Sequence, residues 1–181
     1  MKSLLRVLVV AAMMVFAVHA ADDVVSAVHG TITKLDEGSK TVVVRTKDGT
    51  EHTLHFVDKT SVTGADKTAA GAKDAFHGLS EGSEVVAHYT VKGTDETAVG
   101  IEKVGKDGLK SVDGTVTKVG KDGKTVVVKA ADGTEQTFDV VGHDSAEAAK
   151  SIAKGADKAG KTTVYYTEQG GKKIAHFFEK L

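Results

Sequence analysis

The chain contains the same stretch of sequence twice. The run GTITKLDEGSKTVVVRTKDGTEHTLHFV begins at Gly30 and returns at Gly114 as GTVTKVGKDGKTVVVKAADGTEQTFDVV, 84 residues later, with 15 of the 28 positions identical. Self-similarity at a fixed spacing is typical of a duplicated structural unit. We therefore predict that the 181-residue chain holds two units of one fold in series.

The first twenty residues have the pattern of an export signal. Lys2 and Arg6 precede the apolar run VLVVAAMMVFAV, and Val18 and Ala20 then occupy the −3 and −1 positions of a small-residue cleavage site. A membrane anchor is the alternative, but about 12 apolar residues are short for a span that needs roughly 20. We expect cleavage after Ala20 and a soluble exported protein, periplasmic or extracellular, with no membrane attachment.

Composition limits the chemistry that is open to the chain. Its 24 basic and 25 acidic side chains give a formal net charge of −1, and it has no cysteine. A chain so close to neutrality does not attract phosphate backbones by bulk charge, so no nucleic acid is expected as a partner. The absence of cysteine excludes disulfides, thiol catalysis and thiolate metal sites.

Each unit is predicted to contain five strands. In the second copy, the alternation of apolar and polar residues and the β-branched runs predict strands over 111–119, 124–130, 134–141, 161–168 and 172–180. A short helix is predicted from Asp144, a capping residue, to Gly155. In the first copy, strands are predicted near 25–35, 40–46, 50–57, 83–91 and 97–104, with a looser connector over 58–82.

Five strands with a connector between the third and the fourth match the element order of the OB-fold, a small Greek-key barrel. We predict an all-β protein with short helices, built as two tandem five-stranded OB-like barrels over 21–106 and 107–181; a pair of SH3-like rolls is the alternative. Strand alternation assigns ten residues to the two cores: Ile32, Val42, Val44, Leu54 and Phe56, and Val116, Val126, Val128, Phe138 and Val140.

The motif GTVTKV…KTVVVKAADGTEQTF resembles repeated small β-barrel domains of exported bacterial proteins of unknown function. The resemblance covers both units, and so nearly all of the chain after the signal. It implies a secreted or periplasmic β-domain and brings no catalytic residue with it.

Seven histidines follow the signal, which raises the hypothesis of a copper or zinc site. His52 and His55 are three apart on a strand, so their side chains should leave opposite faces and cannot chelate together. His29, His55 and His88 are predicted to face outward, and their counterparts in the second copy are not histidines. These three are the candidate ligands of a site in the first unit; solvated polar side chains are the alternative.

Arg45 and Lys129 occupy the same place on the second strand of each unit, on a face that OB-folds use for ligands. A repeated cation on a threonine-rich face suggests an anionic glycan or peptide as ligand. The alternative is a solvated charge that deters edge aggregation.

No enzymatic constellation is present, because the chain lacks a nucleophile elbow, a His-Glu-x-x-His motif and a phosphate loop. The Asp-Gly pairs at 48–49, 107–108, 122–123 and 132–133 read as turns rather than calcium loops. The favoured hypothesis is a binding or structural module of the bacterial envelope without a cofactor. A copper- or zinc-binding protein is the alternative, and an enzyme is the least favoured.

Overall fold

A computed structural model describes residues 25–64, 69–70, 76, 78–106, 108–121, 123–140 and 159–181. The predicted signal, the predicted helix from Asp144 to Gly155, and the turn residues Asp107 and Asp122 lie outside these ranges. Within the described ranges, no helix has the length and apolar character needed to cross a membrane.

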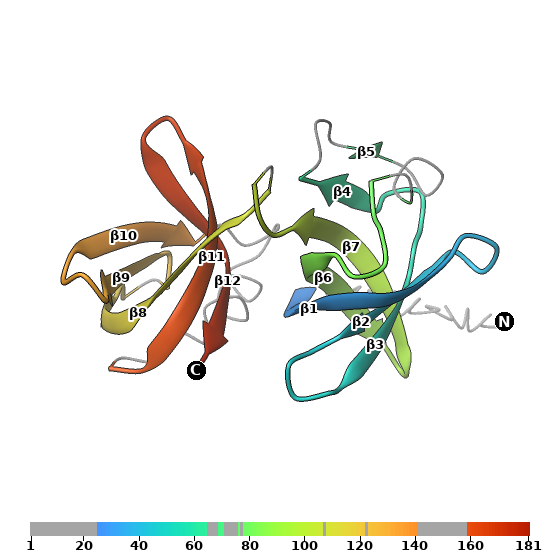
Figure 1. Cartoon of the computed structure of the whole chain (residues 1–181), viewed down its shortest axis with the longest axis horizontal. Helices are drawn as coiled ribbons and strands as arrows, with labels where there is room; N and C mark the ends of the chain where they lie inside the picture. The colour runs from blue at the N-terminus through green and yellow to red at the C-terminus, as the bar shows by residue number, and fades with distance from the viewer. Residues whose placement is uncertain are drawn as a thin grey trace, which may run out of the picture.

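The first unit is a ring of five strands (Figure 1). They are β1 (Val25–Asp36), β2 (Thr41–Arg45), β3 (Glu51–His55), β6 (Glu84–Lys92) and β7 (Asp95–Lys103), in the order β3-β2-β1-β6-β7. Parallel pairing of β3 with β7 closes the ring, with Leu54 opposite Glu96. The short strands β4 (Ser61–Thr63) and β5 (Ala69–Ala70) extend the sheet beyond β7.

The second unit is a closed barrel with the same connectivity. Its strands are β8 (Lys110–Val119), β9 (Thr125–Ala130), β10 (Glu135–Val140), β11 (Lys161–Gln169) and β12 (Lys172–Lys180). In both units the first strand pairs antiparallel with the second and the fourth, and the third pairs in parallel with the fifth. This is the OB-like arrangement. The prediction of two five-stranded barrels is confirmed, and the open roll is excluded.

The predicted core is confirmed in both barrels. All ten assigned residues are buried, with at most 5% of any of them exposed. They fall into two separate clusters, one inside each ring, and Leu54 and Phe138 have no exposed surface. The strands β4 and β5 were not predicted, because pieces of three and two residues are too short to show an alternation.

Two glycines at equivalent positions allow the first strand of each barrel to approach the second. A Cβ atom on Gly30 would lie 2.4 Å from the carbonyl oxygen of Arg45. One on Gly114 would lie 2.4 Å from Val128 Cγ1 and 2.6 Å from the carbonyl oxygen of Lys129. Neither separation leaves room for a methyl group, which explains why the repeated motif begins with glycine.

The Asp-Gly pairs that the structure describes in full are hairpin turns. Gly49 and Gly133 have φ values of +90° and +86°, a conformation that favours glycine. In each turn the Oδ1 of the preceding aspartate, Asp48 or Asp132, accepts a hydrogen bond from the N–H two residues on, at 3.1 and 2.9 Å. These carboxylates are engaged locally, as the turn interpretation predicts.

Candidate metal centre

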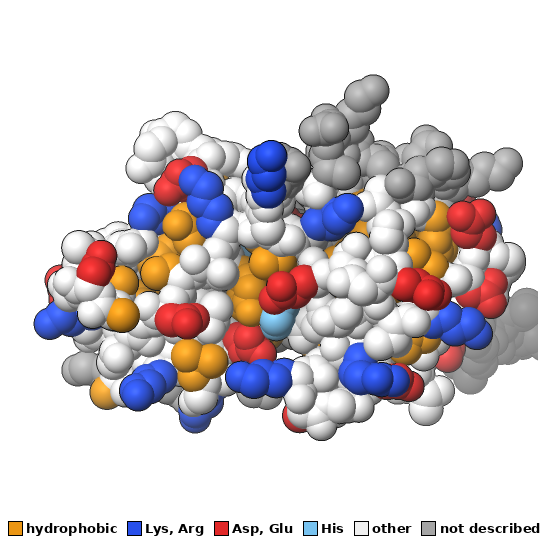
Figure 2. All heavy atoms as spheres, in the orientation of Figure 1, with side chains coloured by type: hydrophobic (Ala, Val, Ile, Leu, Met, Phe, Trp, Pro, Cys, Tyr) orange, Lys and Arg blue, Asp and Glu red, His pale blue; other side chains and the backbone are white. Residues whose placement is uncertain are grey.

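The two barrels pack against each other along an apolar seam. Val86, Leu109 and Tyr165 are buried there, and Val104 and Phe177 pack against them. This cluster is separate from both barrel cores. Figure 2 shows hydrophobic, acidic and histidine side chains gathered on the visible face where the barrels meet. The seam therefore combines an apolar cluster with polar side chains, some of which are buried.

Strand β6 carries residues to the seam from the first barrel. Val85 and Ala87 pack into the first core, so the alternation of the strand turns Glu84, Val86 and His88 outward. Val86 belongs to the seam cluster. His88 is a polar residue on the outward face, yet only 1% of it is exposed. An outward position on this strand is thus a buried position in the whole molecule.

Strand β12 carries residues to the seam from the second barrel through a β-bulge. Its register pairs Tyr165 with Phe177 and Tyr166 with Ala175, so His176 is an extra residue without a partner on β11. A bulge re-aims the side chains around it. As a result, two residues that are adjacent in sequence both reach the seam. His176 contacts Glu102, and Phe177 packs against the apolar cluster.

His88, Glu102 and His176 form a compact group of metal-ligating side chains. Glu102 Oε2 lies 3.2 Å from His88 Nε2 and 2.9 Å from His176 Nδ1. All three ligand atoms lie within 4.8 Å of one another. The first two residues belong to the first barrel and the third belongs to the second. The group is the one set of three or more potential ligands found among the described residues.

The carboxyl group of this cluster is ionised at neutral pH. Burial by itself disfavours the charged form of Glu102, but hydrogen bonds and charge interactions with His176 and His88 outweigh it and lower the pKa of the carboxyl to about 2. A carboxylate between two imidazoles is a donor set that divalent transition metals accept.

A threonine orients the histidine of the second barrel. Thr167 Oγ1 lies 2.9 Å from His176 Nε2, while His176 Nδ1 faces Glu102. Ligating histidines usually donate their second ring N–H to a neighbouring oxygen, which sets the ring orientation. Thr167 can accept that bond and leave Nδ1 as the ligand atom.

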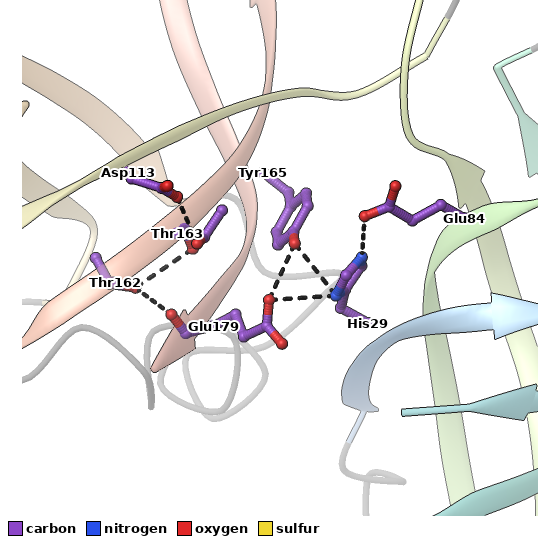
Figure 3. A network of polar contacts seen from close by, with 7 residues as sticks. All are labelled: His29, Glu84, Asp113, Thr162, Thr163, Tyr165 and Glu179. Atoms are coloured by element: carbon purple, nitrogen blue, oxygen red, sulfur yellow. Dashed lines mark hydrogen bonds and ion pairs between the residues drawn. The ribbon is translucent and has the colours of Figure 1, made fainter. Parts of the chain in front are cut away.

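A second polar cluster joins the barrels around His29 (Figure 3). His29 Nε2 lies 2.7 Å from Glu84 Oε1, and His29 Nδ1 lies 3.2 Å from Glu179 Oε2. The Tyr165 hydroxyl donates to Glu179 Oε2 at 3.0 Å, and its ring stacks on His29 with centroids 4.4 Å apart. Burial, and then the charge of Glu179, raise the pKa of the Tyr165 phenol.

The two clusters use equivalent positions of the repeated fold. Glu102 and Glu179 are 77 residues apart, as are His88 and Tyr165. Each glutamate contacts the His88 or Tyr165 of its own barrel and one histidine of the other barrel. Because tyrosine stands where the first barrel has histidine, only the first cluster offers two imidazoles. The repeat therefore supplies two inter-barrel contacts and one set of metal-type ligands.

The structure separates the three histidines that were predicted as ligands. His88 belongs to the metal-type cluster, His29 belongs to the second cluster, and His55 is exposed on β3. They do not form one ligand set among the described residues. Sequence reasoning missed Glu102 and His176. The equivalence of Glu102 with Glu179 was visible in the repeat, but the bulge at His176 has no signature in the sequence.

The predicted anion-binding cations lie on the hairpins outside both clusters. Arg45 contacts Glu51, with Nη2 and Nε 2.6 and 3.0 Å from its Oε1, and about half of each side chain is exposed. Arg45 also lines a groove of about 680 Å³ beside the second cluster. Lys129 is exposed and lies opposite Glu135 in the register. Each cation thus has an acidic cross-strand neighbour.

Comparison with known proteins gives no match to a family model and none to a curated protein. Two solved structures are similar at 11% sequence identity. A crystal structure of Ag(I)CusF covers 44% of this chain and 97% of its own length, with a TM-score of 0.33. Apo-CusF residues 6–88 from Escherichia coli covers 49% of this chain and 98% of its own length, with a TM-score of 0.34.

Proposed function

We propose that the protein binds one divalent transition metal ion, Zn²⁺ or Cu²⁺, between its two barrels through His88, Glu102 and His176. The observation that carries the proposal is the convergence of two imidazole nitrogens and one carboxylate oxygen within 4.8 Å. Soft ligands that favour Cu⁺ are absent from the mature chain, because it has no cysteine and its three methionines all lie in residues 1–20.

The distances between the ligand atoms suit such an ion. Zinc binds imidazole nitrogen at about 2.0–2.1 Å, so two ligand atoms of a tetrahedral site are about 3.4 Å apart. The carboxylate oxygen of Glu102 lies 3.2 Å from one histidine nitrogen and 2.9 Å from the other. Small movements along these two edges would admit an ion. Three protein ligands leave the fourth position to water or to another small ligand.

A metal ion would be the ligand of the exported binding module that the sequence predicts. The role we propose is binding in the periplasm or outside the cell, without catalysis. An anionic glycan or peptide at Arg45 is less favoured, since Glu51 already contacts both Nε and Nη2 of the guanidinium. The three proposed metal ligands instead have their donor atoms within 4.8 Å of one another.

The test is a competition titration of untagged protein, stripped with a chelator, against a chromophoric zinc indicator. We expect one Zn²⁺ per chain, and we expect His88→Gln to weaken binding by at least about tenfold, since loss of even an outer-shell partner costs 10–100-fold. The matched control is His55→Gln, which removes an exposed histidine from the same barrel. The same titration with Cu²⁺ and a copper indicator covers the second ion. A wild-type chain that competes for neither ion, or equal losses of affinity in the two variants, would refute the proposal.

A further inference from the structure

We infer that metal occupancy and docking of the two barrels are thermodynamically coupled, so that the ion acts as a clamp between them. The inference rests on the proposed function and adds its consequence for the arrangement of the protein. Its basis is the origin of the ligands: His88 and Glu102 come from the first barrel, and His176 comes from β12 of the second.

Separation of the barrels would remove one of the three ligands. The ion would keep only His88 and Glu102, and its affinity would fall. Linkage is reciprocal, so a ligand that binds the docked form more tightly stabilises docking by the same factor. A site made by one barrel alone would have no such effect.

The rest of the seam is small, so a bound metal ion would change how tightly the two barrels dock. Among the described residues, its apolar part consists of the buried Val86, Leu109 and Tyr165, two partly buried residues beside them, and Ala27 of β1, which packs against the second core; its other polar part is the His29 cluster. Interfaces between domains of one chain resemble transient ones, and relative motion is expected unless they are large and apolar. An added metal–ligand bond across the seam would therefore shift the balance toward the docked form.

The connection between the barrels provides a reporter of the seam. Leu109 follows the last strand of the first barrel, and its backbone N–H donates to the carbonyl oxygen of Lys103 at 2.8 Å. Its own carbonyl accepts from the N–H of Gly105 at 3.0 Å, which forms a tight loop. The side chain is only 2% exposed and lies in the seam cluster. Separation of the barrels would expose residue 109 to a reagent, because its cluster contains residues of both barrels.

The experiment measures thiol labelling under native conditions. The chain has no cysteine, so Leu109→Cys supplies its single thiol. With Zn²⁺ at about 100 times its Kd, we expect labelling by a maleimide to slow by well over twofold and by at most roughly 100-fold, the limit reached when the undocked form binds no zinc. Val119→Cys, at a position that is 37% exposed, is the control for direct effects of zinc on the thiol or the reagent. Its labelling rate should be the same with and without Zn²⁺.

Three results would decide the matter. If the indicator shows Zn²⁺ bound but the labelling rate of the Leu109→Cys chain stays within about twofold, the coupling is refuted and the metal site stands. If neither Zn²⁺ nor Cu²⁺ binds, the proposed function fails and the coupling fails with it. Adding His176→Gln should abolish the zinc-dependent protection; its persistence would also refute the coupling, because the second barrel would then contribute no ligand.

A second measurement covers the case in which Leu109→Cys does not fold. Nitroxide labels on Lys92→Cys and Lys129→Cys, exposed positions of the two barrels, report the distance between them. We expect Zn²⁺ to narrow the distance distribution toward the docked value. An unchanged distribution with zinc bound would refute the coupling.

Discussion

Truncation of Phe138 tests the assignment of strand faces that underlies both barrels. The side chain has no exposed surface, lies opposite Val126 in the register, and packs edge-on to Tyr166 with centroids 5.3 Å apart. Replacing a buried phenylalanine with alanine typically costs about 3–5 kcal/mol. A domain of about 75 residues has a total stability of about 4–11 kcal/mol. Phe138→Ala should therefore remove between about a quarter and all of the stability of the second barrel.

The assay is urea unfolding followed by hydrogen exchange and mass spectrometry, which reads peptides from each barrel separately. With a urea dependence of about 1–3 kcal/mol per molar, the midpoint of the second barrel should fall by at least about 1 M. Thr137→Ala is the matched control, because Thr137 is the exposed neighbour on the same strand. Its effect should stay within about 0.5 kcal/mol.

Equal shifts from Phe138→Ala and Thr137→Ala would show that the faces of β10 are assigned wrongly. The first barrel has its own core cluster, so its peptides should keep their protection when the second barrel unfolds. If they lose protection in parallel, the barrels share one folding unit, and the predicted division at residue 106 fails.

Three further predictions concern the close approach of strands, the seam and the signal. Gly114→Ala should destabilise the second barrel by about 1–3 kcal/mol in urea unfolding, because the new methyl group meets a core side chain and a backbone carbonyl. Gly133→Ala, where nothing lies within 4 Å, should cost only the strain of its positive φ, about 1–2 kcal/mol. A cost of Gly114→Ala below about 0.5 kcal/mol would contradict the packing argument. The raised pKa of Tyr165 means that the unfolded chain loses this proton at lower pH than the folded one, so stability should fall as pH rises above about 10. Tyr165→Phe should make this fall in stability with pH shallower. Thermal melts at pH 9 to 11 that show the same dependence of stability on pH in the variant and the wild-type chain would contradict the prediction. Intact-mass measurement of the exported protein should give a chain that starts at Ala21, and a retained leader would disprove cleavage after Ala20.

The local pattern of the sequence was enough to predict the strands, their faces and the ten core residues. Side chains of a strand alternate between its two faces, so the pattern of apolar residues shows which face is buried. The repeat tests each assignment a second time, because equivalent positions such as Val42 and Val126 carry apolar residues in both copies. The Asp-Gly turns were predictable for the same reason, since the chemistry of a turn is contained in four adjacent residues. Closure of the ring also follows from the element order, because five short strands with a long connector after the third match one small barrel.

Only the tertiary structure determines which residues the outward faces of the strands contact. His88 was predicted to face outward, but whether an outward face meets water or another barrel depends on contacts between distant parts of the chain. Tyr165 and His29 stack although 136 positions separate them. His176 reaches Glu102 because a bulge breaks the alternation of β12, and a bulge is set by pairing with a neighbouring strand rather than by the residues of the strand itself. The sequence by itself therefore determined two barrels, and the packing of one barrel on the other brought together the three side chains that we propose as metal ligands.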